Sequence, residues 1–189
     1  MKLTKQTLKS FEPCEEGYEW YLKQNTTDLF KLVDLLIKEE RYQWCSWLIT
    51  KFMTKKQSIQ YAVNAAEKVL YIFEKEYPKD NRPRRAIEAA KEYLKNPNSI
   101  NKDILVKAKD AACVPYYTSN IDTSTAASTA ASTAASAAHY TYYATEAAVA
   151  VYAANDAAVY AVYAADADKN SKSLKTEIVK YGIKLLKEE

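Results

Sequence analysis

Glycine and proline are scarce in this chain, with only 2 Gly and 5 Pro among 189 residues. A β-rich domain of this length needs many turns, and turns draw heavily on these two residue types. A glycine-rich nucleotide loop needs several glycines close together, which this chain does not contain. The sequence therefore excludes both classes, and its length fits one compact domain.

Histidine and cysteine are equally few. The chain has one histidine, His139, and three widely separated cysteines, Cys14, Cys45 and Cys113. These residues cannot supply the clustered ligands of a structural zinc or iron–sulfur site, so we expect neither a metal nor a cofactor. A triad hydrolase would need His139 or an unusual lysine as its base, so we expect a binding protein without enzymatic activity. The cysteines are expected to be unpaired and buried.

Long apolar runs and a strong charge of either sign are also missing. No signal-peptide run opens the chain, and the alanine-rich segment 144–165 carries Asn155 and Asp156 at its centre, so it would insert poorly into a membrane. We therefore expect a cytoplasmic protein without a membrane partner. The formal net charge of +3, from 27 basic and 24 acidic residues, argues against a nucleic acid polymer as partner. The chain also lacks the acidity typical of an inhibitor of a basic nuclease.

Apolar residues recur with the period of an α-helix through much of the chain. Pro78 ends one such segment, Pro83 begins the next, and Pro115 is expected to break a third. We predict an all-α fold, a compact bundle of about seven helices with long Ala/Tyr-rich helices, in a single domain over residues 1–189. The periodic segments run over 27–40, 44–52, 59–77, 83–95, 101–112 and 171–189.

Composition divides this predicted domain into four parts. Residues 1–25 form an N-terminal arm or short helix, and residues 26–116 form a helical core. Residues 123–168 are rich in alanine and tyrosine and begin with a Ser/Thr/Ala repeat of four residues. Residues 171–189 form a C-terminal helix with lysines on its outer side.

The Ala/Tyr-rich part is predicted to be helical, because alanine has a high helix propensity and neither Gly nor Pro interrupts it. A single rod of about 45 residues would be about 68 Å long at ~1.5 Å per residue, so we expect a break between Ser136 and Tyr143. Alanines in a four-residue repeat spiral around the helix, so neighbouring helices can contact several of its sides. The alternative is disorder, because Ser/Thr/Ala repeats have little to bury.

Three stretches of the middle of the chain resemble a family of immunity proteins. They are YQWCSWLI at 42–49, YAVNAAEKVL at 61–70 and the stretch 72–90, which contains the distinctive run from Tyr77 to Arg84, YPKDNRPR. Members of this family occur beside bacterial toxin genes and in phage genomes, and they also end in Ala/Tyr-rich helices. The resemblance implies neutralisation by binding, without enzymatic activity. The Ser/Thr/Ala repeat departs from the family's alternating Ala, Tyr and Asp.

The first candidate site is a cluster of arginines. Arg82, Arg84 and Arg85 lie at the start of a predicted helix, where free backbone N–H groups and the helix dipole already favour an anion. Their guanidinium groups are suited to a phosphate or a carboxylate. An internal anion is the alternative, because Glu88 lies four residues after Arg84 and Glu74 or Asp80 could reach from the preceding turn. Tyr77, just before this run, joins the candidate ligand-binding residues.

The second candidate feature is the abundance of tyrosine, with 16 Tyr against 4 Phe. A tyrosine ring can stack on a base while its hydroxyl makes polar contacts. His139 and Tyr143 are further candidates, and His139 can equally be a hydrogen-bonded residue of the core or its rim. Helical spacing places four residues on one face, where their rings either bind a ligand or fill the core: Tyr152, Asp156, Tyr160 and Tyr163.

Two kinds of target compete for such a non-catalytic inhibitor. The first is a small phosphate-bearing nucleotide of a bacterial immune pathway, which a phage-type sponge would enclose with Arg82, Arg84 and Arg85 on the phosphates. The second is a protein toxin, as the resemblance implies. The Arg- and Tyr-rich, nearly neutral composition favours the first, whereas an enzyme that degrades such a signal ranks below both. Small-residue helices also make a homo-oligomer plausible.

Overall fold

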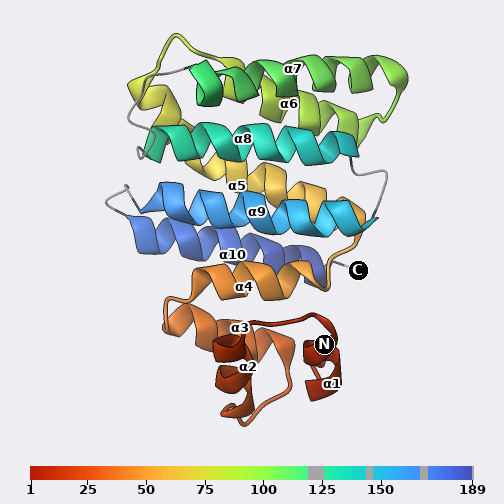
Figure 1. The fold of residues 1–189 in the computed structure, drawn as a ribbon, viewed down its shortest axis with the longest axis vertical. Helices are drawn as coiled ribbons and strands as arrows, with labels where there is room; N and C mark the ends of the chain where they lie inside the picture. Colours follow the sequence, from red (N-terminus) through yellow and green to blue (C-terminus); the bar gives the residue numbers. More distant parts are fainter. Residues whose placement is uncertain (119–125, 144–146, 167–169, 189) are drawn as a thin grey trace.

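The computed structural model describes residues 1–118, 126–143, 147–166 and 170–188; within these it leaves out the side chains of 113–118, 126–128, 140, 142–143 and 147–154. Every regular element in these ranges is an α-helix (Figure 1), which confirms the all-α prediction. The helices are α1 (Lys5–Ser10), α2 (Glu15–Leu22), α3 (Leu29–Lys38), α4 (Tyr42–Thr50), α5 (Lys55–Glu76), α6 (Arg82–Lys95), α7 (Ser99–Thr118), α8 (Ala126–Tyr143), α9 (Ala147–Ala165) and α10 (Ser171–Lys187).

The predicted number of about seven helices was too low, because much of the N-terminal arm is also helical. Two short helices form there, and each is capped by a side chain. Thr4 Oγ1 accepts a hydrogen bond from the backbone N–H of Thr7 at 3.1 Å and begins α1. Cys14 Sγ accepts one from the N–H of Gly17 at 3.4 Å and begins α2. Both helices are too short to show a periodic apolar face.

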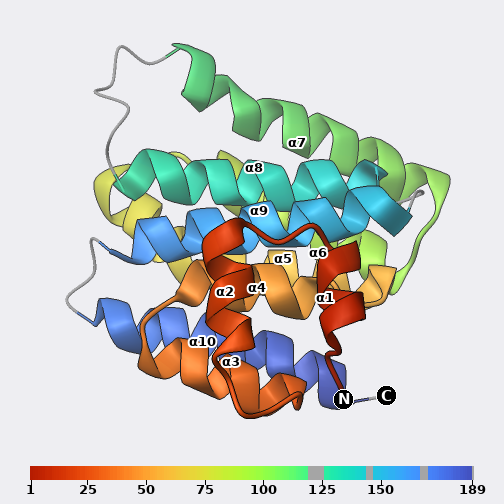
Figure 2. The same cartoon turned by 60° about the horizontal axis from the view of Figure 1, so that its bottom comes forward.

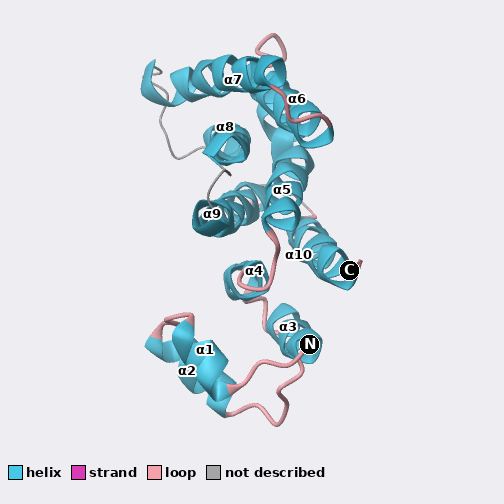
Figure 3. Cartoon of the chain, turned by 90° about the vertical axis from the view of Figure 1, so that its right-hand side faces the viewer, coloured by secondary structure: helices cyan, strands magenta, loops and turns pink. Residues whose placement is uncertain are grey.

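The helices stack as an elongated two-column arrangement. Figure 3 shows α8, α9 and α4 in one column and α5, α10 and α3 in the other. The α6–α7 pair closes one end of the stack, and α1 and α2 cover the opposite end, which comes forward in Figure 2. A candidate site at the start of α6 and one beneath α2 therefore lie at opposite ends of the molecule.

Helix α5 lies at the centre of the stack and is buried on two faces. One face, with Tyr61 and Phe73, packs into a core shared with α3, α4, α9 and α10. The other, with Ile59 and Leu70, packs into a second core shared with α6, α7 and α8. The helix starts at a capping box in which Thr54 Oγ1 accepts from the N–H of Gln57 and Gln57 Oε1 accepts from the N–H of Thr54.

The Ser/Thr/Ala repeat is a helix, α8, and its alanines contact several neighbours, as predicted. Helices α5, α6, α7 and α9 all pack against α8. The buried hydroxyls of this helix are satisfied within it, because Thr133 Oγ1 donates to the carbonyl of Thr129 at 2.8 Å and Thr141 Oγ1 donates to that of Ala137 at 2.7 Å. The fully or almost fully buried alanines are Ala130, Ala131, Ala134, Ala135, Ala137 and Ala138.

Two predicted helix breaks lie elsewhere in the structure. Helix α7 continues past Pro115 to Thr118, because a proline removes only its own N–H from the backbone hydrogen bonds and its fixed φ is compatible with a helix. Helix α8 runs through the whole interval from Ser136 to Tyr143, where the break was expected, and α9 begins at Ala147. The interval contains no Gly or Pro to interrupt a helix.

The cysteines also differ from one another. Cys45 is buried, as expected, whereas Cys14 is exposed at the start of α2, where its sulfur caps the helix. The prediction of a buried residue was therefore wrong for Cys14, because a position before a helix can use the sulfur as an acceptor. The side chain of Cys113 lies outside the described residues.

Gly182 allows α10 to approach α4 and α5 closely. A Cβ atom at this position would lie 2.5 Å from Ile49 Cδ1, 3.0 Å from Tyr61 Cε2 and 3.2 Å from Met53 Cε. All three neighbours are buried side chains, so little room exists for them to move. Tyr61 is held in place by a 3.1 Å hydrogen bond with Ser46.

We expect Gly182→Val to lower the free energy of unfolding by about 1–3 kcal/mol, because the added methyl groups overpack this contact. Chemical denaturation measures the change. Lys180→Val, at an exposed position of the same helix, is the matched control and should change stability by less than about 0.5 kcal/mol. Equal stability of the two variants would contradict the close contact.

Candidate functional site

The arginine cluster starts with an ion pair inside the α5–α6 turn. Asp80 binds the Arg82 guanidinium through both carboxylate oxygens, with Nε–Oδ1 at 2.9 Å and Nη2–Oδ2 at 2.5 Å. Asp80 Oδ1 also accepts a hydrogen bond from the backbone N–H of Arg82 at 3.1 Å. The Arg82 side chain holds the pKa of Asp80 below its ordinary value. The chain thus supplies its own anion at the start of α6.

Arg84 has a second internal partner. Its Nε and Nη2 each donate to one carboxylate oxygen of Glu74 on α5, both at 2.6 Å. This two-point pairing joins α6 to the end of α5 and raises the pKa of Arg84. Internal carboxylates, the alternative that the sequence left open, are therefore confirmed for Arg82 and Arg84, with Asp80 and Glu74 as the partners.

Arg85 is exposed and forms no ion pair with a described residue. It lines a groove of about 470 Å³ between α6 and α7, together with Arg82. The cationic side chain of Lys107 and the acidic side chains of Glu88 and Glu92 line the same groove. Because Asp80 already neutralises Arg82, only Arg85 and Lys107 remain among the cations of this lining to attract an anion, opposite Glu88 and Glu92.

The described side chains of Tyr77, His139, Asp156 and Tyr160 are not part of the lining of this groove. Tyr77 ends α5 and packs its ring against Phe73, with the two ring centres 5.1 Å apart. His139 is half-buried on α8, and burial, with a smaller contribution from Lys109 of α7, lowers its pKa. The structure therefore does not bring the arginines, Tyr77 and His139 into one site.

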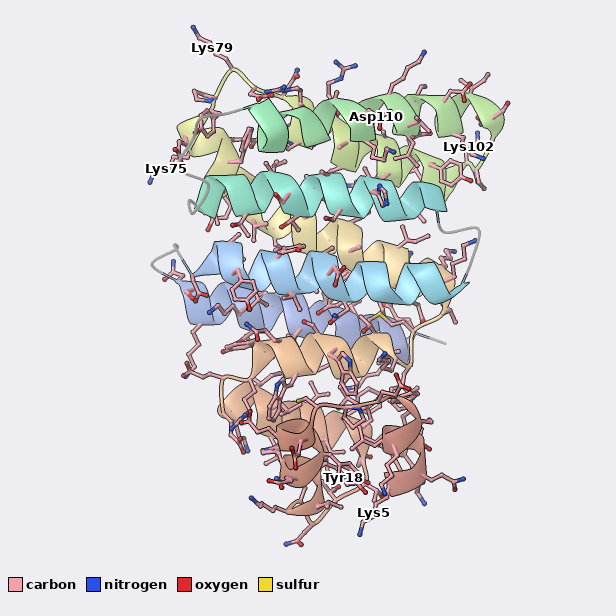
Figure 4. The ribbon with its side chains drawn as sticks, viewed as in Figure 1. Lys5, Tyr18, Lys75, Lys79, Lys102 and Asp110 are labelled. Atoms are coloured by element: carbon pink, nitrogen blue, oxygen red, sulfur yellow. The ribbon has the colours of Figure 1, made fainter. Side chains whose placement is uncertain are left out.

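The exposed charges mark the two ends of the stack in Figure 4. Lys75 and Lys79 project around the α5–α6 turn, near the arginine cluster, and Asp110 lies on α7 above α8. Lys5 projects from the opposite end, where Tyr18 lies partly buried with Lys9 over its ring. The arginine cluster thus lies in a region where basic side chains are already surrounded by solvent, which weakens their attraction for a distant anion.

The predicted tyrosine face of α9 is directed outward. Tyr160 is 43% exposed and Tyr163 is 50% exposed, and Asp156 on the same face is partly buried. In the described part of the helix, the opposite side consists of buried alanines, among them Ala158 and Ala161, and of Val162. Of the two alternatives, filling of the core is excluded for Tyr160 and Tyr163. The side chains of Tyr143 and Tyr152 lie outside the described residues.

The sequence did not reveal a cluster of tryptophans at the α1–α2 end. Trp44 and Trp47 of α4 pack, partly buried, against the first core and line a cavity together with Trp20 of α2. Nothing in the sequence indicated that Trp20 lies close to Trp44 and Trp47, because Trp20 belongs to the N-terminal segment, which shows no helical period. None of the predicted site residues whose side chains are described lines this cavity.

Among the described residues, no group of three or more His, Cys, Asp or Glu side chains is arranged to hold a metal ion. None of the helices in the described part of the chain is both long and apolar enough to span a membrane.

The comparisons with known proteins place the chain in a family. Residues 48–188 match the family described as Imm-5 like putative immunity protein, and residues 1–56 match the YdhT N-terminal domain. No curated protein and no solved structure matches the chain. The larger match covers most of the chain, so the protein is an immunity-type protein by class and belongs to the Imm-5 like family. This confirms the resemblance seen in the middle of the sequence and extends it to α10.

The Asp80–Arg82 pair predicts a pH-dependent contribution to stability. A carboxylate with a depressed pKa in the folded state stabilises the fold above its ordinary pKa of 3.8, and the effect is lost as the pH falls through the lower folded value. We expect Asp80→Asn to lower the free energy of unfolding by about 0.5–1 kcal/mol at pH 7, because the pair is partly exposed and screened.

Denaturation of both proteins between pH 2 and pH 7 measures this dependence. The difference between wild type and Asp80→Asn should close at the acidic end, where Asp80 is protonated in both states. Asp103→Asn changes an exposed carboxylate on α7 and serves as the control. A difference that stays constant with pH would show that the ion pair is not its origin.

Proposed function

We propose that this protein neutralises a protein toxin by binding it through the exposed tyrosine face of α9. The observation that carries the proposal is the outward position of Tyr160 and Tyr163 on a helix whose described buried side consists of alanines and Val162. The alanines and Val162 pack α9 into the stack, so the two exposed tyrosines do not contribute to its core. Membership in the Imm-5 like immunity family supports a protein partner.

Tyrosine is well suited to such an interface. It buries a large ring at a low cost in conformational entropy and keeps a hydroxyl for hydrogen bonding. Tyrosines are also enriched among the few residues that contribute most of the free energy of protein–protein binding. Asp156 lies one helical turn before Tyr160, partly buried on the same face, and adds an acidic group beside the two rings. The proposal involves no catalysis, and the absence of catalysis, a cytoplasmic location and a homo-oligomeric state stay predictions.

The test needs the toxin, which is sought among the products of the flanking genes and identified by its co-purification with the wild type. Co-expression with that toxin should restore growth, and the two purified proteins should form a stable complex. We expect the double variant Tyr160→Ser, Tyr163→Ser to weaken the complex by at least about 30-fold, the loss typical of one removed interface hot spot. Isothermal titration calorimetry measures the dissociation constant.

Tyr71→Ser is the matched control, because Tyr71 on α5 is also 43% exposed and lies outside the proposed face. It should leave the affinity and the protection of growth unchanged. If the double variant binds and protects like the wild type while remaining folded, the face on α9 is not the interface.

A nucleotide sponge is the second candidate, and the groove between α6 and α7 is the observation that favours it. Arg85 and Lys107 both line this groove, whose volume of about 470 Å³ is sufficient for a nucleotide-sized ligand. Phosphate-bearing nucleotides that bind here should raise the melting temperature of the wild type. Arg85→Gln with Lys107→Gln should remove that effect. An unchanged melting temperature over a panel of nucleotide signals would exclude the sponge.

A further inference from the structure

All three tryptophans of the chain line one cavity at the α1–α2 end. The cavity has a volume of about 270 Å³, and its lining comes from segments that are far apart in sequence: the start of the chain, α2, α3, α4 and α9. Most of its lining is apolar or aromatic. The residues that define its walls are Leu8, Trp20, Leu36, Trp44, Trp47 and Val159.

The aromatic walls are held in fixed positions by contacts outside the cavity. Trp20 Nε1 donates to Glu39 Oε2 at 2.8 Å, and its ring meets that of Trp44 edge to face at 6.3 Å. The Arg41 guanidinium lies 4.2 Å from the Trp44 ring centre and donates to Glu16 at 2.8 Å. Because the Trp20 indole N–H is bound to Glu39, this residue offers hydrocarbon surface to the cavity.

Tyr21, which also lines the cavity, is anchored in the same way. Its hydroxyl donates to the backbone carbonyl of Leu3 at 2.7 Å. Together these contacts fix the aromatic walls of the cavity. The wall side chains therefore lose little conformational entropy when a ligand binds.

Asn155 provides a polar group at this cavity. It extends from α9, and its Oδ1 is buried without a hydrogen-bond partner. An unpaired buried acceptor is costly, and native proteins contain few of them. Ser58 Oγ and Asn64 Oδ1 are also unpaired in the described part of the chain, but neither residue lines this cavity. Rotation about χ2 lets the Asn155 amide turn either its oxygen or its nitrogen toward a ligand.

We propose that this cavity binds a small planar aromatic compound of about two fused rings, whose single hydroxyl or N–H group donates to Asn155. The size follows from volume: an apolar cavity of about 150 Å³ holds benzene in another protein, and this cavity is nearly twice as large. The aromatic character follows from the tryptophan walls, and the single donor follows from the unpaired oxygen. The inference rests on the cavity alone and is independent of toxin binding.

The test uses the full chain and 2-naphthol as the probe. Because the chain contains three tryptophans and all of them line the cavity, the tryptophan indole N–H signals in ¹H–¹⁵N NMR spectra report on this cavity specifically. We expect these signals to shift on titration with a common dissociation constant. We also expect the melting temperature to rise with the concentration of 2-naphthol.

The contribution of Asn155 is measured with 2-methoxynaphthalene, which has a similar shape but no donor. Wild type should bind it about fivefold more weakly than 2-naphthol, as the loss of one hydrogen bond predicts. Asn155→Leu should remove this preference. Retention of the preference in Asn155→Leu would show that another group recognises the hydroxyl.

Val159→Phe fills the cavity from α9 and should abolish binding of 2-naphthol without lowering the melting temperature. Tyr163→Ala, on the exposed face of the same helix, is the control and should bind like the wild type. Two results would overturn the proposal: indole signals of folded wild type that do not shift in 1 mM 2-naphthol, or undiminished binding in folded Val159→Phe. If Val159→Phe does not fold, Asn155→Leu and its preference provide the test.

Discussion

The structure depends on the close approach of α5, α8 and α9, which alanine makes possible. Small side chains let helix backbones come together without a thick layer of large residues between them. The alanines on α8 are buried on several sides, and α9 buries its own alanines against α5 and α4. Because α5 takes part in both cores, any change that separates these helices would loosen the whole stack.

This way of packing has a consequence for the surface. A helix that packs mainly through small side chains can carry larger functional side chains on its other side. On α9 these are Tyr160 and Tyr163, which are large and exposed. On a helix that packs through leucine and phenylalanine, exposed tyrosines resemble the buried residues in size. On α9 the buried side chains are small and the exposed ones are large, so the large side chains can be assigned to binding and the small ones to packing.

Periodicity predicted the helices well wherever an apolar face was long enough to repeat, as in α3, α5 and α6. It failed for α1 and α2, which are defined by the capping atoms of Thr4 and Cys14 and not by a repeat. The sequence located the arginine cluster, but it could not show which groups the arginines bind. Whether Arg84 binds a ligand or Glu74 depends on how α6 folds back on α5, a tertiary relationship that local sequence does not contain. The tryptophan cavity was hidden for the same reason.

The two family matches overlap over residues 48–56, from the end of α4 to the start of α5. The contacts of α4 show how the two matched segments pack into one stack of helices. Helix α4 lies in the segment matched by the YdhT N-terminal domain, yet it packs against α9 and α10, which belong to the Imm-5 like match. The tryptophan cavity crosses the same boundary, since Trp20 and Trp44 come from one match and Asn155 from the other. A ligand in this cavity would therefore contact both segments at once, and its binding energy would add to the contacts that hold α2 and α4 against α9.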